Sequence, residues 1–257
     1  MEWLTTDNGK YRIESLSPRT FHGALNVIRE SFCQDEYVSI GCGINNNRAA
    51  ASELLELCAD AALDGVSLVA LDLETHEVVA VAFNKIQTQA SSGSQRSFFE
   101  IFAEERCKEA ASRSLIHFMA DVDSRCNLFH KYSVDCSLEI MFLATLREHR
   151  HKALGVHLCR LSIEVAKKMR CGPISPISVE DLGPKYSMLL PRKAITTYPK
   201  ICQAIWTSEG SQKVGRALHF TVHLTVPLSE FVFDGKTYSE RIGNESAFCE
   251  VAAIALE

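Results

Sequence analysis

The sequence predicts an α/β or α+β protein with a mixed sheet, and three observations support this prediction. Strand-like runs and runs with helical spacing follow one another along the whole chain. Two β-rich runs, 66–73 and 77–86, meet around a short turn and predict an antiparallel hairpin. A further strand, 138–146, leads through a basic turn directly into a long helix.

The first elements are a strand and a helix. Residues 11–17, YRIESLS, alternate apolar and polar side chains as a half-buried strand does. Ser17 then offers an N-cap, and Pro18 suits the first helical turn. The predicted helix turns one apolar face inward, which consists of Phe21, Leu25, Ile28 and Phe32.

The next elements surround the hairpin. Residues 41–47 contain Asn and Gly and end the first helix, and 49–63 predict a second helix that stops at Asp64-Gly65. After the hairpin, 90–97 form a polar surface loop that we expect to be mobile. Residues 98–131 have helical spacing.

The C-terminal half begins with the helix that follows the strand 138–146. Apolar residues at spacings of three and four predict a helix from Lys152 to Gly172. A strand-like run near 174–180 and a helix that begins at Pro184 come next. Two more strands are expected within 217–226 and 246–256. We expect residues 1–10 to be a mobile tail.

Composition limits the classes of protein. The 257 residues, 46% of them hydrophobic, suffice for one sizeable core, so we expect a single domain, 1–257. The formal charge of -5 argues against a general affinity for nucleic acid or acidic lipid and favours a cationic small molecule. The ten cysteines form no Cys-x-x-Cys pair, which predicts reduced core residues, no metal site and a cytoplasmic location.

The stretch 146–168 combines charge with a helix start. The first turn of a helix has backbone N–H groups without acceptors at the positive end of the dipole, and such a turn binds phosphate. Within 150–155, RHKALG, small residues allow close backbone approach and two basic residues add charge, so a pyrophosphate is the expected ligand. The alternative is an ordinary solvated helix start. Phosphate loops of nucleotide hydrolases, dinucleotide fingerprints and serine-hydrolase elbows are absent from the sequence.

Three segments in this order resemble a known family. Arg150-x-x-Ala153-x-Gly155 is similar to the acetyl-CoA signature of the GNAT acetyltransferases. Segment 123–158 resembles the invertebrate arylalkylamine N-acetyltransferases, as do 31–41 and 66–84, so that the resemblance covers about residues 11–172. It implies the GNAT fold, in which helices flank a central twisted mixed sheet of about seven strands.

The resemblance also implies an acetyl-CoA site. Leu143, Ala144 and Thr145 would line the pantetheine arm. The pyrophosphate would be held by Arg150, His151, Lys152, Ala153, Leu154, Gly155 and Val156. The sequence departs from the family in two places, with Ala153 where glycine is usual and Tyr37 where proline commonly follows the acidic residue.

The family's chemistry requires a base and an acid. An alkylamine with a pKa like that of lysine is about 99.9% protonated at neutral pH, so it must lose a proton before it attacks. Glu36 matches the family's proposed base, although residues of this kind also solvate helix ends. Tyr186 and Ser187 are candidates for protonating the leaving thiolate, although such a pair is more often structural. We assign no catalysis to His149, His151 or His157.

The implied activity is transfer of acetyl from acetyl-CoA to the primary amine of a small arylalkylamine, such as serotonin, dopamine or tyramine, by direct attack in a ternary complex. One alternative is a GNAT enzyme that acts on a polyamine or another amine. The other is a non-catalytic acyl-CoA-binding module. We expect no nucleic-acid or membrane partner, and a monomer or weak homodimer.

Overall fold

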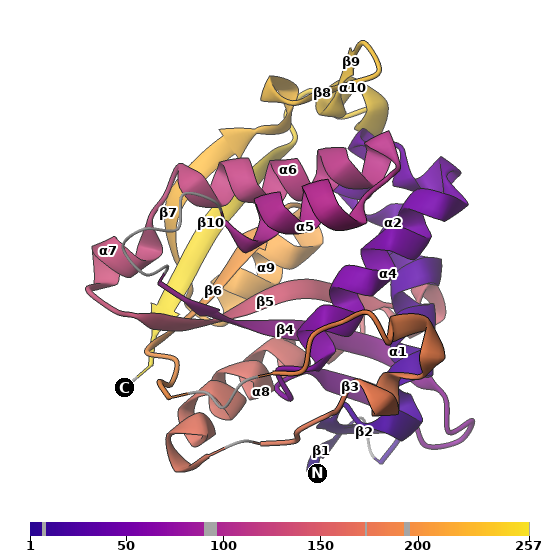
Figure 1. The fold of residues 1–257 in the computed structure, drawn as a ribbon, viewed down its shortest axis with the longest axis vertical. Coiled ribbons are helices and arrows are strands. Elements are labelled where there is room, and N and C mark those ends of the chain that lie inside the picture. The colour runs from indigo at the N-terminus through magenta and orange to yellow at the C-terminus, as the bar shows by residue number, and fades with distance from the viewer. Residues whose placement is uncertain (7–8, 90–96, 173, 193–195, 257) are drawn as a thin grey trace.

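The computed structural model describes residues 1–6, 9–89, 97–172, 174–192 and 196–256. Most of its strands form one large sheet (Figure 1). These strands are β1 (Glu2–Thr6), β2 (Tyr11–Ser15), β3 (Leu68–Asp72), β4 (Val78–Thr88), β5 (Cys136–Thr145), β6 (Ile201–Trp206), β7 (Thr221–Pro227) and β10 (Phe248–Ala255). Their order is β1-β2-β3-β4-β5-β6-β10-β7, and a separate pair consists of β8 (Val232–Phe233) and β9 (Lys236–Thr237). In the described residues the large sheet thus has eight strands, where about seven were expected.

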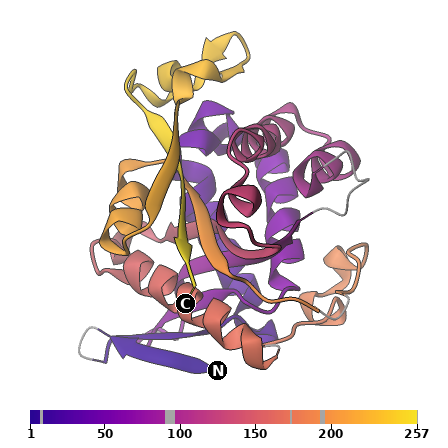
Figure 2. The ribbon, with the colours of Figure 1, turned by 90° about the vertical axis from the view of Figure 1, so that its left-hand side faces the viewer.

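Helices cover both faces of the sheet (Figures 1 and 2). One face carries α1 (Pro18–Val27), α4 (Arg48–Ala62), α5 (Phe98–Arg106) and α6 (Ala110–Ser124), whose apolar residues share one core. The other face carries α8 (Leu154–Lys168) and α9 (Glu209–Ala217) over a second core. Shorter helices are the π-helix η1 (Ile28–Phe32), α2 (Cys33–Asp35), α3 (Tyr37–Gly41), α7 (Leu128–Tyr132) and α10 (Tyr238–Ile242). The 3₁₀ turns are η2 (Ile44–Asn46), η3 (Arg147–His149), η4 (Met169–Cys171), η5 (Glu180–Leu182), η6 (Pro184–Tyr186) and η7 (Leu228–Glu230).

The sheet opens between its two central strands. β5 and β6 are parallel, and they pair only where 137–139 meet 201–203. Beyond these pairs β5 and β6 diverge, and β7 and β10 continue the steep direction of β6 in Figure 1. On its other edge β5 pairs with β4, with a bulge at Met141 because Phe83 pairs with Phe142 and Asn84 with Ile140. The edge of β5 that faces the opening therefore has backbone groups that no strand pairs from residue 140 onward, in the described residues.

Residues 2–6 correct the expectation of a mobile tail. They form β1, which pairs antiparallel with β2. Trp3 anchors this strand, because its indole Nε1 donates a 2.9 Å hydrogen bond to Ser15 Oγ and the Lys168 ammonium lies 4.3 Å from its ring centroid. These contacts with distant residues could not be read from the composition of the segment.

The elements predicted between residues 11 and 89 agree with the structure in order and type, except that the first helix is divided into α1, η1, α2 and α3. Three later elements differ. The helical segment 98–131 is divided into α5, α6 and α7. The run 174–180 is not a strand in its described residues, since Pro176 interrupts it while Ile177 and Val179 pack into the core. The helix expected from Pro184 is one 3₁₀ turn, η6. Residues 90–96 of the expected mobile loop lie outside the described residues.

All ten cysteines are unpaired, and nine are buried as expected, whereas Cys171 is exposed. No helix in the described part of the chain is both long and apolar enough to cross a lipid bilayer.

Candidate active site

The N-terminal end of α8 offers three free backbone donors. The first hydrogen bond of this helix runs from His157 N to the Ala153 carbonyl oxygen at 3.0 Å. Among the described residues, the N–H groups of Leu154, Gly155 and Val156 therefore have no acceptor. All three residues line an open cleft at the mouth of the sheet. This is the arrangement that binds a phosphate group.

Ala153 takes the backbone conformation that a glycine would favour. It is the N-cap of α8 and has a φ of 58°, in the left-handed region. An L-residue in this region costs roughly 1–2 kcal/mol compared with its ordinary conformation. The loop thus has the backbone turn that leads into the helix, but it carries strain that glycine would not. At Gly155 a Cβ would make only ordinary contacts, 3.6 Å from Leu143 and 3.7 Å from Val214.

The structure brings most of the residues predicted for the cofactor site to this one cleft. Those that line it are Leu143, Ala144, Thr145, Arg150, His151, Ala153, Leu154, Gly155 and Val156. Lys152 is exposed and stands outside this set. Residues that the sequence did not predict complete the lining, and they include Ser31, Asp35, His149, Ser208, Ser211 and Lys213.

The guanidinium of Arg150 is held by protein groups. Its Nε donates to the Thr145 carbonyl oxygen at 3.1 Å, and one terminal nitrogen donates to Ser31 Oγ at 2.9 Å. The same nitrogen pairs with Asp35, which also pairs with Arg147. Hydrogen bonds from Arg147 and Arg150 lower the pKa of Asp35. Arg150 therefore fixes the end of β5 against the helices before α3, and it shares the single negative charge of Asp35 with Arg147.

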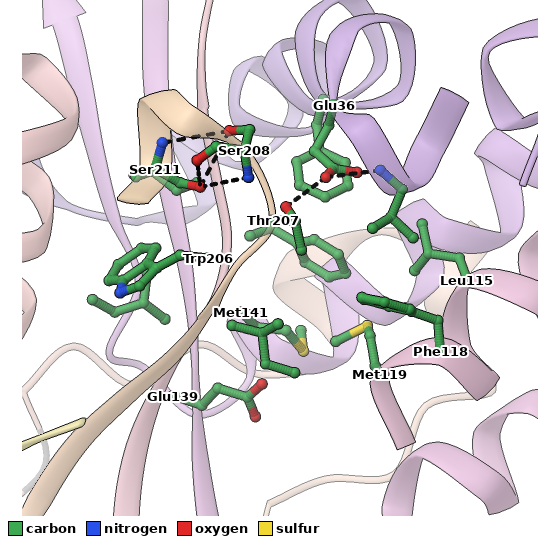
Figure 3. Close-up of a pocket in the computed structure, with 16 residues that line it drawn as sticks. Glu36, Leu115, Phe118, Met119, Glu139, Met141, Trp206, Thr207, Ser208 and Ser211 are labelled. Atoms are coloured by element: carbon green, nitrogen blue, oxygen red, sulfur yellow. Dashed lines mark hydrogen bonds between the residues drawn. The ribbon is translucent and has the colours of Figure 1, made fainter. Parts of the chain in front are cut away.

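Glu36 lies where this cleft meets a second pocket, and it lines both. It is the N-cap of α3, where its two carboxylate oxygens accept from Val38 N at 3.0 Å and Ser39 N at 2.8 Å. The Thr207 hydroxyl also donates to Glu36 Oε1 at 2.6 Å (Figure 3). Burial raises the pKa of the Glu36 carboxyl, and the hydrogen bonds from Thr207 and the two amides only partly offset this.

Tyr37 stands where the family commonly has proline, yet the local backbone is compatible with either residue. Tyr37 is the first residue of α3, the helical position that proline favours. The preceding Glu36 has φ −75° and ψ 140°, the extended conformation that precedes proline. The substitution therefore does not displace Glu36.

The second pocket is mainly apolar and lies between α6, β5 and β6 (Figure 3). Its walls include Leu115, Phe118, Met119, Met141, Ile205 and Trp206. Its polar side chains are Glu36, Glu139, Thr207, Ser208 and Ser211. A small molecule with an apolar body and a polar end fits such a lining.

Tyr186 and Ser187 are not part of either cavity. Tyr186 is 4% exposed and packs edge-on against Phe21, with ring centroids 5.5 Å apart, while Ser187 is exposed. Burial raises the pKa of Tyr186 to about 12. These positions correct the prediction that the pair faces the leaving group. Ser208 and Ser211, which the sequence reasoning missed, line both cavities instead.

Comparisons with known proteins place this geometry in a known fold. No protein-family model matches the sequence, and no curated protein matches it either. Among solved structures, arylalkylamine N-acetyltransferase 2 of Aedes aegypti matches with a TM-score of 0.71 at 16% identity, over 96% of this chain and 99% of that one. A putative arylalkylamine N-acetyltransferase 7 of the same mosquito matches with a TM-score of 0.69 at 18% identity, over 96% and 88%.

A third solved structure extends the comparison to another amine. The polyamine N-acetyltransferase of Drosophila melanogaster, which catalyses the formation of N-acetylagmatine, matches with a TM-score of 0.67 at 14% identity, over 96% of this chain and all of that one. The chain therefore has the GNAT fold, as the sequence predicted. At these identities the likeness shows the fold alone.

Proposed function

We propose that this chain is an N-acetyltransferase that moves the acetyl group of acetyl-CoA to the primary amine of a small molecule. One observation carries the proposal. Glu36, held by Thr207, lies at the junction between a cleft with free helix N–H groups and an apolar pocket that ends in the opening between β5 and β6. A donor and an acceptor that approach from the two cavities meet beside this carboxylate.

The cleft fits the chemistry of coenzyme A. The pyrophosphate would accept hydrogen bonds from the N–H groups of Leu154, Gly155 and Val156. The amides of the pantetheine arm would bind the unpaired backbone edge of β5 beside Leu143 and Ala144. When bound, acetyl-CoA supplies an acetyl group activated as a thioester.

Glu36 would act as the general base, directly or through one water. It takes a proton from the substrate ammonium, and the amine nitrogen then forms a bond to the acetyl carbon while the C–S bond breaks. The electron pair of that bond leaves with the sulfur of coenzyme A, and the amine nitrogen gives up a second proton, so that the products are the N-acetylated amine and the free thiol. Ser208 and Ser211 replace Tyr186 and Ser187 as the candidates that would pass this proton to the sulfur, because both line the junction.

The apolar pocket would hold the body of the acceptor amine. Arylalkylamines, the class that the sequence resemblance implies, fit its walls because Phe118 offers an aromatic ring and Met119 adapts to a ring. Polyamines are a second candidate class. The buried carboxylate of Glu139, at the other end of the pocket from Glu36, favours them. The remaining alternative, an acyl-CoA-binding module without catalysis, has the same cleft but requires no working base at Glu36.

A thiol-release assay with purified protein tests this proposal. Acetyl-CoA is mixed with tyramine, serotonin, dopamine, cadaverine, agmatine or spermidine, and the acetylated amine is identified by mass spectrometry. We expect release with at least one amine and loss of release in Glu36→Gln. Thermal stabilisation by coenzyme A without thiol release from any amine would instead support the binding module.

A further inference from the structure

The apolar pocket contains a second carboxylate. Glu139, on β5, is 4% exposed, and Figure 3 shows it at the opposite end of the pocket from Glu36. Its Oε2 accepts a 2.8 Å hydrogen bond from Gln87 Nε2. Its Oε1 has no hydrogen-bond partner among the described residues. A buried carboxylate with a free oxygen calls for a donor.

The charge of Glu139 is not balanced by the residues around it. Asp123 of α6 is near enough to repel it, and this repulsion adds to burial in raising the pKa of Glu139 to about 7. Burial likewise raises the pKa of Asp123 to about 6. Neither carboxylate forms an ion pair within the described parts of the chain. A cation bound in the pocket beside Glu139 would stabilise the charged form of this carboxylate.

The nearest lysine is already neutralised. Lys85 Nζ lies 3.1 Å from Asp60 Oδ2 and 3.6 Å from Asp64 Oδ2. Arg192 pairs with the same two aspartates, so two cations face two anions there. The charges within this network therefore balance one another. Lys85 does lower the pKa of Glu139, but this effect is smaller than the increase caused by burial and by Asp123.

A second polar atom beside Glu139 also lacks a partner. Gln203 on β6 pairs with Glu139 in the parallel register, so both side chains point to the same face of the sheet. Gln203 is 6% exposed, and its Oε1 is buried with no hydrogen bond among the described residues. Gln203 is therefore the neighbour of Glu139 on the same face of the sheet, where the strands begin to diverge.

We propose that Glu139 binds a second cationic group of the acceptor in the apolar pocket, so that the substrate is a diamine with an ammonium or guanidinium at its far end. This inference rests on the proposed function. The methylene chain between the two groups would contact Met119, Met141 and Ile205. From Gln203 to Thr207, which holds Glu36, the chain advances four residues, or about 13 Å. The acceptor therefore needs an extended spacer.

The test compares amines that have the same carbon skeleton but differ in whether they carry a second polar or charged group. Cadaverine and pentylamine form one matched pair, and tyramine and phenethylamine form another that differs only in a hydroxyl. For the wild type we expect kcat/KM to be about tenfold or more higher for cadaverine than for pentylamine, as one charge-assisted hydrogen bond provides. Glu139→Gln should remove this preference by raising KM for cadaverine more than KM for pentylamine, so that the two values of kcat/KM become nearly equal.

A matched control uses another buried glutamate. Glu250 on β10 is 7% exposed, pairs with Arg216 and lies outside the pocket, so Glu250→Gln should leave the cadaverine preference intact. Thermal unfolding of each variant checks that it folds.

The outcomes separate this inference from the proposed function. If pentylamine is acetylated but cadaverine has no advantage, or Glu139→Gln preserves the advantage, the subsite is wrong and the acetyltransferase remains. The cation subsite is also wrong if the wild type prefers tyramine to phenethylamine but does not prefer cadaverine to pentylamine, and if Glu139→Gln removes the tyramine preference. Glu139 would then bind the substrate hydroxyl. If no amine is acetylated, the proposed function fails. In that case the affinity of cadaverine for the wild type and for Glu139→Gln, measured by calorimetry, still tests the subsite. Equal affinity in both proteins, or no binding to the wild type, would refute it.

Discussion

The Thr207 hydroxyl donates a 2.6 Å hydrogen bond to Glu36 Oε1, and this bond joins two segments far apart in the chain. Thr207 follows directly after β6, while Glu36 is the N-cap of α3. The bond therefore connects one side of the opening in the sheet to the helices that cover the other. It holds the carboxylate at the junction of the two cavities and stabilises its charged form.

Removing the Thr207 hydroxyl should change the pH dependence of the reaction. The hydrogen bond lowers the pKa of Glu36 against the effect of burial, so Thr207→Val should raise this pKa further. Because the base must be deprotonated, the acid limb of kcat/KM should move to higher pH, and the loss of activity should be greatest at low pH. Thr207→Ser keeps the hydroxyl and serves as the control. An acid limb at the same pH in all three proteins would contradict this role.

Removing the Glu36 carboxylate should affect chemistry more than cofactor binding. Glu36→Gln keeps an oxygen that can cap α3, so the helix start should survive. We expect kcat/KM for the amine to fall about 100-fold or more, the usual contribution of a general base. Calorimetry should show coenzyme A binding within about twofold of the wild type, a difference below 0.5 kcal/mol. Activity within a few-fold of the wild type would exclude Glu36 as the base.

Ala153→Gly should stabilise the protein. Glycine adopts the left-handed conformation without strain, so we expect the free energy of unfolding in urea to rise by about 1 kcal/mol. Ala49 is the matched control, because it is exposed in the ordinary helix α4, where Ala49→Gly should lower stability by about 0.5–1 kcal/mol. Opposite signs are expected, and equal destabilisation by both variants would show that Ala153 is unstrained.

The ion pairs of Asp35 with Arg147 and Arg150 should stabilise the folded protein only above acidic pH. The folded protein lowers the pKa of Asp35, so its stabilisation is present above the unfolded value of about 3.9 and disappears as the pH falls through the lower, folded value. Asp35→Asn should therefore destabilise the protein at pH 7 and lose this effect in strong acid. Asp135→Asn, which breaks an exposed pair with Lys200, should have a smaller effect at pH 7. A pH-independent effect of Asp35→Asn would contradict the pairing.

The cofactor cleft was predictable from sequence because its parts are adjacent in the chain. The strand, the turn and the first residues of α8 follow one another, so residues 143–156 identify the site locally. The partners of Arg150 are different. Ser31 and Asp35 lie more than a hundred residues before it, and a local motif cannot show that they occupy its guanidinium.

The other half of the site was missed because β6 gives little sequence signal. ICQAIW is short, and nearly all of its side chains are buried, so it lacks the alternation of a half-exposed strand. Its parallel pairing with β5 joins distant segments. Because the sequence pattern does not reveal β6, it also does not place Thr207, Ser208 and Gln203 beside β5. The residue that protonates the leaving thiolate is therefore predicted at Tyr186. That side chain is explained by packing against Phe21.

Calorimetric titration of coenzyme A into the wild type and Gly155→Glu is the most direct measurement of whether the start of α8 binds pyrophosphate. A Cβ at Gly155 fits with ordinary contacts, so the variant should fold, while its carboxylate would repel the anion at the free N–H groups. We predict saturable binding to the wild type and at least about tenfold weaker binding to the variant, or 1.4 kcal/mol. No saturable heat from the wild type, or equal affinity in both proteins, would contradict the account.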